Sequence, residues 1–155
     1  MPVQKRLKIR VRGGVQVDRP VAEVFSFLRD VDRFPEWQST NFEIAEKREL
    51  GNGALRAHGS VRDRRNVLGK EIESVYQVTD LQEDRSMTLE VKEGPVYWIM
   101  TFSVEEVEGA TYVTADGGGD LGDLGVSKAA TAKSCQEMLE NDLHTLRDVL
   151  ESVSR

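Results

Sequence analysis

The sequence predicts an α+β fold in which one long C-terminal helix packs against an antiparallel sheet. The first observation is an apolar stripe over 126–153, where residues such as Ala132, Leu139 and Leu146 recur at helical spacing. The second is a series of segments in which apolar and polar residues alternate, which is typical of half-buried strands. The third is that short turns separate the middle segments, and short turns join antiparallel neighbours. We expect a helix of this length, on the order of 40 Å, to bury its stripe on the sheet.

The first part of the chain is predicted to form a strand followed by two short helical segments. Apolar residues alternate over 7–17, which predicts the first strand. Asp18 is a suitable N-cap and Pro20 suits a first helical turn, so a short helix is expected to follow over 21–28. Residues 34–37 carry two aromatic side chains and predict a second turn of helix or a loop.

Six further strands are predicted before the long helix. They cover 42–50, 54–62, 67–81, 87–91, 96–104 and 111–116. Gly51-Asn52-Gly53 is a strong hairpin signal between the first two of them. We expect a charged turn at 63–66 and a glycine-rich loop at 117–125, which would lead into the helix.

Length and composition limit the class of protein. At 155 residues the chain is expected to form a single domain, 1–155. A net charge of −6 argues against a nucleic-acid partner, because neutralising phosphates requires a basic surface. No apolar run has the length of a signal peptide or a membrane span, so we expect a cytoplasmic protein without stable membrane insertion.

The sequence contains no recognisable catalytic or metal-binding motif. Two histidines and one thiol form neither a metal set nor a nucleophile–base pair, so no metal and no cofactor are predicted. His58 falls within the strand predicted at 54–62, where it is either exposed or a weak candidate for an acid or base in a cavity. No catalytic residue is assigned beyond the weak candidates His58 and Tyr76.

A cavity is predicted under the first half of the long helix, where small or flexible side chains leave room above a curved sheet. The side chains expected to wall it and bind a ligand are Trp37, Tyr76, Met87, Trp98, Met100, Cys135 and Met138. Any one of them alone is most simply a core residue, but together they form soft walls suited to a flat or greasy ligand. Tyr76 also offers a hydroxyl to a ligand oxygen. The loop at 117–125 is expected to flank the entrance.

Five motifs stand at the joints of the predicted elements. They are residues 20–25 with Leu28 and Asp30, residues 34–37, 51–53, 76–80 and 109–114. Together they resemble the START-like (helix-grip) superfamily, and within it the polyketide cyclase/dehydrase and lipid-transport family. The resemblance covers nearly the whole chain. It implies a seven-stranded antiparallel sheet curled around the C-terminal helix, two short helices after the first strand, and an apolar pocket between sheet and helix. It carries over no catalytic residue.

Three functions stay open at this point. The first is a protein that binds a small hydrophobic ligand, such as a lipid, a quinone or a polyketide-like compound. The second is a polyketide cyclase/dehydratase in which Tyr76 or His58 polarises carbonyls or moves protons. The third is an interaction module whose pocket is filled by side chains. The scarcity of ionisable residues on the inferred inward faces favours the first. The sequence leaves open whether the protein is a monomer or a homodimer.

Overall fold

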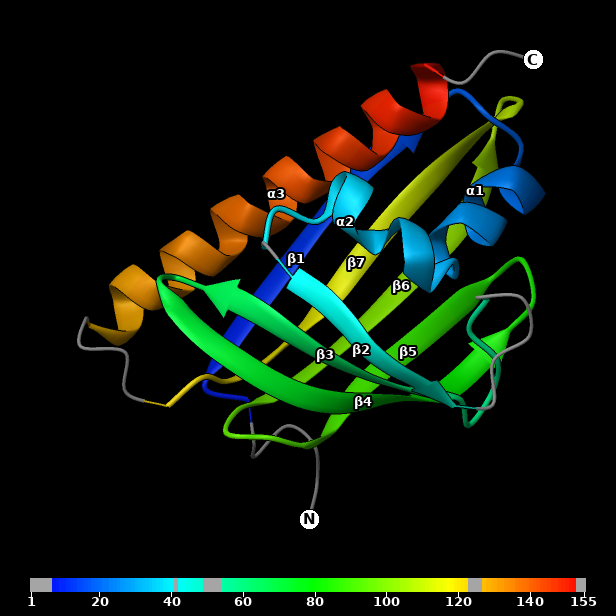
Figure 1. Cartoon of the computed structure of the whole chain (residues 1–155). Helices are drawn as coiled ribbons and strands as arrows, with labels where there is room; N and C mark the ends of the chain where they lie inside the picture. The colour runs from blue at the N-terminus through cyan, green and yellow to red at the C-terminus, as the bar shows by residue number, and fades with distance from the viewer. Residues whose placement is uncertain (1–6, 41, 49–53, 123–126, 153–155) are drawn as a thin grey trace.

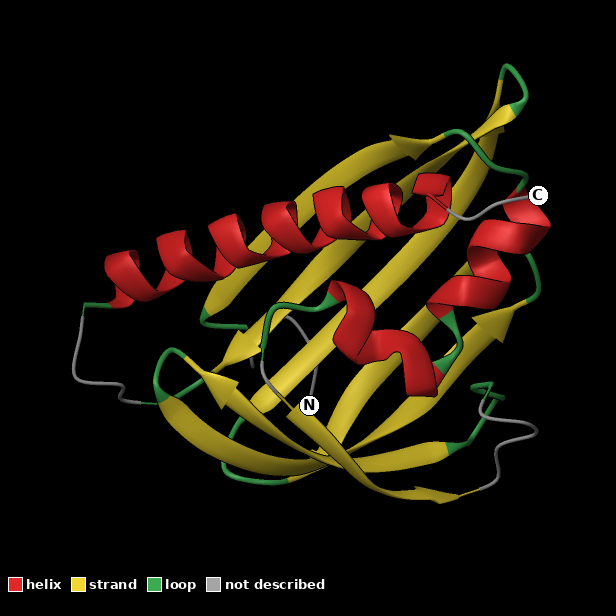
Figure 2. Ribbon diagram, turned by 45° about the horizontal axis from the view of Figure 1, so that its top comes forward, coloured by secondary structure: helices red, strands yellow, loops and turns green. Residues whose placement is uncertain are grey.

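A long helix lying on a curved sheet dominates the computed structural model, which describes residues 7–40, 42–48, 54–122 and 127–152. Helix α3 (Lys128–Ser152) lies along one face of a seven-stranded antiparallel sheet, which confirms the predicted α+β, helix-grip fold (Figure 1). Two short helices, α1 (Val21–Leu28) and α2 (Phe34–Trp37), lie on the same side of the sheet as α3 (Figure 2). A 3-10 turn, η2 (Val31–Arg33), joins them.

The sheet is a meander to which the first strand is added at one edge. The strands are β1 (Ile9–Val17), β2 (Phe42–Arg48), β3 (Ser60–Val67), β4 (Lys70–Gln82), β5 (Ser86–Glu93), β6 (Tyr97–Val107) and β7 (Ala110–Asp120). Their order across the sheet is β1-β7-β6-β5-β4-β3-β2. Strands β2 to β7 are therefore neighbours in chain order, whereas β1 pairs with β7, with Ile9 opposite Gly119.

Helix α3 packs closely along β1. Its buried residues recur every three or four positions and include Leu139, Leu143 and Leu146. A Cβ added to Gly13 in β1 would lie 3.0 Å from Cδ1 of Leu143. The absence of a side chain at Gly13 thus allows the helix to approach the strand, and the predicted apolar stripe is buried there.

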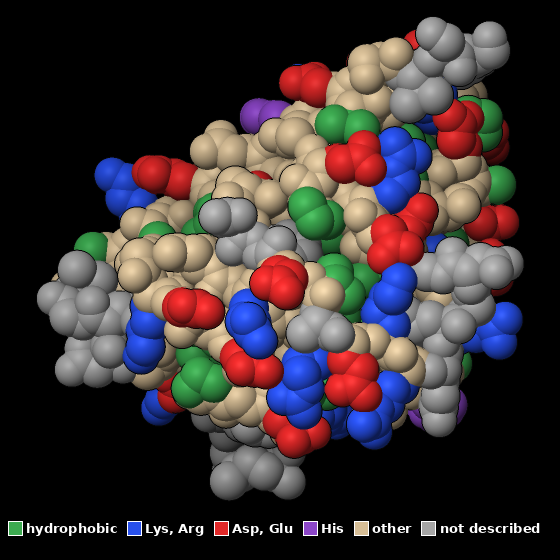
Figure 3. Space-filling view, viewed as in Figure 1, with side chains coloured by type: hydrophobic (Ala, Val, Ile, Leu, Met, Phe, Trp, Pro, Cys, Tyr) green, Lys and Arg blue, Asp and Glu red, His purple; other side chains and the backbone are tan. Residues whose placement is uncertain are grey.

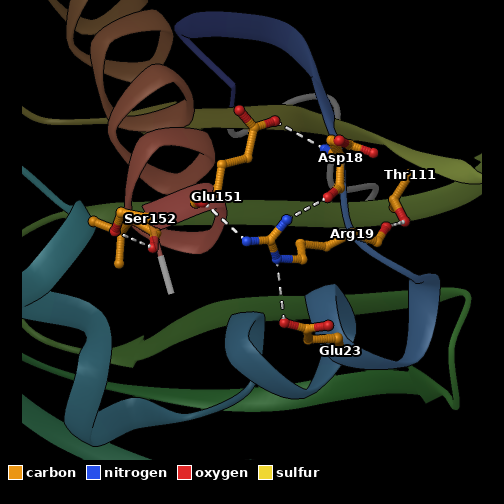
Figure 4. A network of polar contacts seen from close by, with 7 residues as sticks. Asp18, Arg19, Glu23, Thr111, Glu151 and Ser152 are labelled. Atoms are coloured by element: carbon orange, nitrogen blue, oxygen red, sulfur yellow. Dashed lines mark hydrogen bonds and ion pairs between the residues drawn. The ribbon is translucent and has the colours of Figure 1, made fainter. Parts of the chain in front are cut away.

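Arg19 ties the C-terminal end of α3 to the start of α1 (Figure 4). Its Nη2 donates to the backbone oxygen of Glu151 at 2.9 Å, and its Nε lies 3.6 Å from Glu23. The Asp18 backbone N–H donates to the Glu151 carboxylate at 2.8 Å. The predicted N-cap role of Asp18 is wrong, because Pro20 occupies the N-cap of α1 and no side chain caps it.

Strand β3 begins later than predicted, and the predicted strand over 54–62 is wrong for its first half. Residues 54–59 form an irregular segment, and the supposed turn at 63–66 lies inside β3. The hairpin turn instead lies at Leu68 and Gly69, whose φ values are 52° and 85°. Two consecutive residues with positive φ match the twist of a tight hairpin, which explains why the chain reverses there.

Strand β7 includes residues that were predicted to form a loop. The loop prediction for 117–125 is wrong for Gly117–Asp120, which pair with β6. A Cβ added to Gly117 would lie 2.0 Å from the backbone oxygen of Ile99, so the glycines allow a close approach of two strands. Leu121 and Gly122 lie outside any helix or strand, as predicted. Residues 123–125 of that loop and the predicted hairpin at 51–53 lie outside the described residues.

The surface around β2 and β3 carries intermixed acidic and basic side chains (Figure 3). Arg62 lies 3.8 Å from Glu46 and 3.5 Å from Glu73. Arg64 lies 3.9 Å from Glu43. These side chains are well exposed, so the pairs add little to stability. Within the described ranges, no helix is long and apolar enough to cross a membrane.

Candidate ligand-binding cavity

A cavity of about 200 Å³ lies between the first half of α3 and the sheet. The helical repeat turns Cys135, Met138 and Leu139 toward the sheet, and each of them lines this cavity. The alternation of the strands supplies the opposite wall in the same way. Tyr76 lines the cavity from β4, and Phe102 lines it from β6.

Trp37 reaches the cavity from α2. Its ring packs edge-on against Phe34 and against Phe102, with ring centres 5.9 Å apart in each pair. Only 3% of the residue is exposed. The short helix α2 therefore positions a large aromatic side chain over β6.

Six of the seven residues predicted to bind a ligand line the cavity. They are Trp37, Tyr76, Trp98, Met100, Cys135 and Met138. Met87 does not line it, although it is fully buried. The reason is its place near the start of β5, since the cavity-lining residues of that strand are Leu89 and Val91 further along. A role of these side chains in binding stays a prediction.

His58 lies outside the cavity. The residue is exposed, and its φ of 68° places it in a turn before β3. Its backbone N–H donates to the oxygen of Val78 at 3.0 Å. Its predicted place in a strand is therefore wrong. Of the two alternatives for its side chain, the exposed one agrees with the structure and the cavity acid or base does not. Tyr76 remains as the weak catalytic candidate.

One part of the cavity wall carries charged groups that the sequence prediction missed. Asp63 is fully buried, and Arg65 donates from Nε to its Oδ2 at 2.8 Å. Arg65 also donates from Nη1 to Oε1 of Gln38 at 2.7 Å, and its guanidinium lies 5.8 Å from the ring centre of Tyr76. Arg65 and Asp142 both line the cavity. The expected scarcity of ionisable inward-facing residues is therefore wrong.

A signal for this charged group was present in the sequence. Asp63 and Arg65 share the parity of Val61 and Val67, so a continuous strand through 60–67 turns all four to the same face. Interpreting four consecutive polar residues as a turn hid this alternation.

Three buried polar groups near the cavity have an N–H or O–H donor without an acceptor among the described residues. They are the Trp37 indole nitrogen, the Thr40 hydroxyl and the Tyr76 hydroxyl. All three residues line the cavity. Within the same described ranges, no group of His, Cys, Asp and Glu is arranged to hold a metal ion.

The chain matches the model of a known protein family. A family model described as polyketide cyclase/dehydrase and lipid transport matches residues 8–151. This chain belongs to the polyketide cyclase/dehydrase and lipid-transport family. The description of this family, which names lipid transport, points to a hydrophobic ligand.

Solved structures share the fold of this cyclase/dehydrase-family protein at low sequence identity. A START superfamily protein of Mycobacterium smegmatis is 19% identical, with a TM-score of 0.74 over 94% of this chain and 99% of its own. A protein of Thermus thermophilus is 16% identical, with a TM-score of 0.73 and the same coverage. A Chromobacterium violaceum protein is 12% identical, with a TM-score of 0.71 over 93% and 98% of the two chains. No curated protein matches the chain.

Burial shifts a few ionisable groups of this family member, among them Tyr76, Cys135 and Asp63, toward their neutral forms. Burial raises the pKa of the Tyr76 phenol far above its usual range, although Arg65 opposes the rise. Tyr76 is therefore a hydrogen-bond donor and not a base at physiological pH. Burial also raises the pKa of the Cys135 thiol, which makes it a poor nucleophile. Burial raises the pKa of the Asp63 carboxyl, and Arg65 opposes part of that rise.

Asp142 on α3 is a second carboxyl at the cavity. Burial raises its pKa, against a hydrogen bond that it accepts from the Ser39 backbone N–H at 2.8 Å. A carboxyl whose pKa is raised by folding stabilises the fold when protonated. That contribution is lost as the pH rises from the unfolded-state pKa through the folded-state pKa.

We therefore expect Asp142→Asn to be more stable than the parent protein at pH 8, with an advantage that shrinks toward pH 4. Asparagine can still accept from Ser39 but carries no charge to bury. The measurement is the free energy of unfolding in urea at both pH values. Asp148→Asn, at an exposed position of α3, is the control and should show little change with pH. A loss of stability in Asp142→Asn at pH 8 would show that its charge is needed beside Arg65.

Proposed function

We propose that this protein binds a small apolar molecule, such as a lipid, a quinone or a polyketide-like compound, in the cavity under α3. The observation that carries the proposal is a space of about 200 Å³ whose wall is mostly apolar and aromatic. Membership of a family that includes lipid-transport proteins supports the same class of ligand.

The volume of the cavity limits the size of the ligand. Its volume of about 200 Å³ exceeds the roughly 150 Å³ that suffices for benzene in an engineered protein cavity. It is smaller than the roughly 300–1,000 Å³ that is common for drug-sized ligands. A molecule of one or two fused rings, or a short segment of a longer chain, fits this range.

An enzymatic role as a polyketide cyclase/dehydratase is the second candidate. It is favoured by Arg65 and Asp142, which line the cavity beside Tyr76 and provide polar groups for proton transfer or carbonyl polarisation. Turnover of a poly-β-ketone by the purified protein, lost in Asp142→Asn, would support it. The third candidate, an interaction module with a filled pocket, is disfavoured by the open volume.

Filling the cavity tests the proposal directly. We expect Cys135→Trp to weaken binding of the neutral fluorescent probe 1-naphthylamine at least tenfold, because indole occupies the space beside Met138. The readout is a fluorescence titration, together with the far-UV circular dichroism spectrum to confirm folding. Ala130→Trp, at an exposed position of the same helix, is the matched control and should bind as the parent does. Equal binding by folded Cys135→Trp would place the probe elsewhere.

A further inference from the structure

We infer that the ligand of this cavity carries a neutral carbonyl oxygen, and that the Tyr76 hydroxyl donates a hydrogen bond to it. The inference rests on the proposed function and specifies the chemistry of the ligand. It assigns a polar subsite within an otherwise apolar cavity, on the side where β3 and β4 meet.

Unmet hydrogen-bonding capacity is the first argument. A buried hydroxyl or N–H group in a folded protein almost always has a partner, because leaving it unpaired is costly. Tyr76 is 5% exposed, and its hydroxyl proton has no acceptor among the described residues, since the neighbouring Arg65 can only donate to its oxygen. Trp37 is 3% exposed, and its indole N–H also has no acceptor among the described residues. Both residues line one cavity, reached from α2 and from β4. A ligand that fills the cavity can supply the missing partner.

The chemistry of these groups decides what the ligand must offer. An indole N–H can only donate. The raised pKa of Tyr76 keeps its proton in place, so its hydroxyl can donate as well. The guanidinium of Arg65, 5.8 Å from the Tyr76 ring centre, also consists only of donors. The matching group on the ligand is a hydrogen-bond acceptor.

The charges around the subsite favour a neutral acceptor over a carboxylate. Arg65 is already paired with the buried Asp63 at 2.8 Å. Asp142 lines the same cavity, and it would carry a second negative charge when ionised. An anionic ligand would bring a third negative charge beside these two carboxyls. Among the described lining residues, Arg65 is the only cation that could compensate the three negative charges. A ketone, quinone or ester oxygen accepts a hydrogen bond without that penalty.

Three naphthalenes with one variable group test the inference. They are 2-acetylnaphthalene, 2-ethylnaphthalene and 2-naphthoate, each titrated at pH 8 against bound 1-naphthylamine. For the parent protein we expect the ketone to bind roughly fivefold more tightly than the hydrocarbon, which is the ordinary worth of one hydrogen bond. We expect the carboxylate to bind most weakly of the three.

Tyr76→Phe removes only the hydroxyl. In this variant the preference for the ketone should fall to within twofold, while the affinity for 2-ethylnaphthalene stays unchanged. Tyr112→Phe is the matched control, since Tyr112 is 41% exposed and should leave all three affinities as they are. Without ligand, Tyr76→Phe should unfold at the same temperature as the parent or higher, because it loses a buried hydroxyl whose proton has no acceptor. If the hydroxyl had only a structural role, its removal would instead lower the unfolding temperature.

The outcomes separate this inference from the function on which it rests. If the ketone and the hydrocarbon bind equally to the parent, or if the preference survives in Tyr76→Phe, the assigned subsite is wrong although the cavity binds apolar molecules. If 2-naphthoate binds most tightly, the cavity is a site for anions and the inference fails. If none of the probes binds, the proposed function itself fails with it.

Discussion

Replacing Arg65 by methionine is expected to lower the free energy of unfolding by about 3–5 kcal/mol at pH 8. The reason is that Asp63, which is 0% exposed, would lose the guanidinium that compensates its charge. Gln38 would lose a hydrogen-bond donor at the same time. Methionine keeps much of the volume of the arginine stem, so the expected effect is electrostatic more than steric.

The pH dependence of this stability loss distinguishes an uncompensated charge from a loss of packing. Folding already raises the pKa of the Asp63 carboxyl, so its proton is favoured in the folded state and stability falls as the pH rises through that folded-state pKa. In Arg65→Met the deficit should be largest at pH 8 and smaller at pH 4. Urea unfolding at both pH values measures it. An equal deficit at the two pH values would attribute the loss to packing.

Two further variants complete this test. Arg64→Met alters the preceding residue of β3, whose side chain is 48% exposed, and should change stability by less than about 1 kcal/mol. The double variant Asp63→Leu with Arg65→Met removes both charges, and it should recover most of the stability lost by Arg65→Met. A double variant as unstable as the single one would show that the polar pair specifies the fold around it.

Gly117→Ala is expected to destabilise the protein by more than about 4 kcal/mol or to prevent folding. Its Cβ would lie 2.0 Å from the Ile99 backbone oxygen and 2.8 Å from the Met100 Cα, so neither contact can be relieved by rotating a side chain. Strands β6 and β7 would have to separate or shift register. Thermal unfolding followed by circular dichroism, with the soluble yield, measures the effect.

Gly109→Ala is the control for this substitution. Gly109 has a φ of +84°, but a Cβ there would meet nothing within 4 Å. Only the left-handed backbone then opposes alanine, at a cost of about 1–2 kcal/mol. If Gly117→Ala costs no more than Gly109→Ala, residues 117–120 do not pair with β6 in solution.

The sequence predicted the elements that have long, regular patterns. The stripe of α3 and the alternation of β1, β4 and β6 are each repeated several times, so one exception does not hide them. The errors fall in segments whose local composition is typical of a turn or loop, but whose residues have partners elsewhere in the tertiary structure. The charges of 63–66 resemble a turn, but Asp63 and Arg65 compensate each other inside the protein. The glycines of 117–119 resemble a loop, but they allow β6 to lie close.

The sequence predicts the position of the cavity more accurately than the polarity of its wall. Small and flexible residues such as Cys135 and Met138 indicate where a helix leaves space, and that information is local. The position of Met87 depends on which stretch of β5 lies under α3, and the sequence of one strand does not contain that information. The contacts of Arg65 with Gln38 and Tyr76 join three distant segments, so no single segment predicts them.

The pairing of the first strand with the last has a consequence for how the chain folds as it is synthesised. Strands β2 to β7 can pair hairpin by hairpin as they emerge, because each neighbour follows directly in the chain. Strand β1 must wait for β7, since Ile9 has no partner until Gly119 has been made. Helix α3 follows every strand, and it forms one wall of the cavity. The cavity is therefore the last part of the molecule to be completed, and no ligand can be enclosed by a nascent chain that lacks this helix.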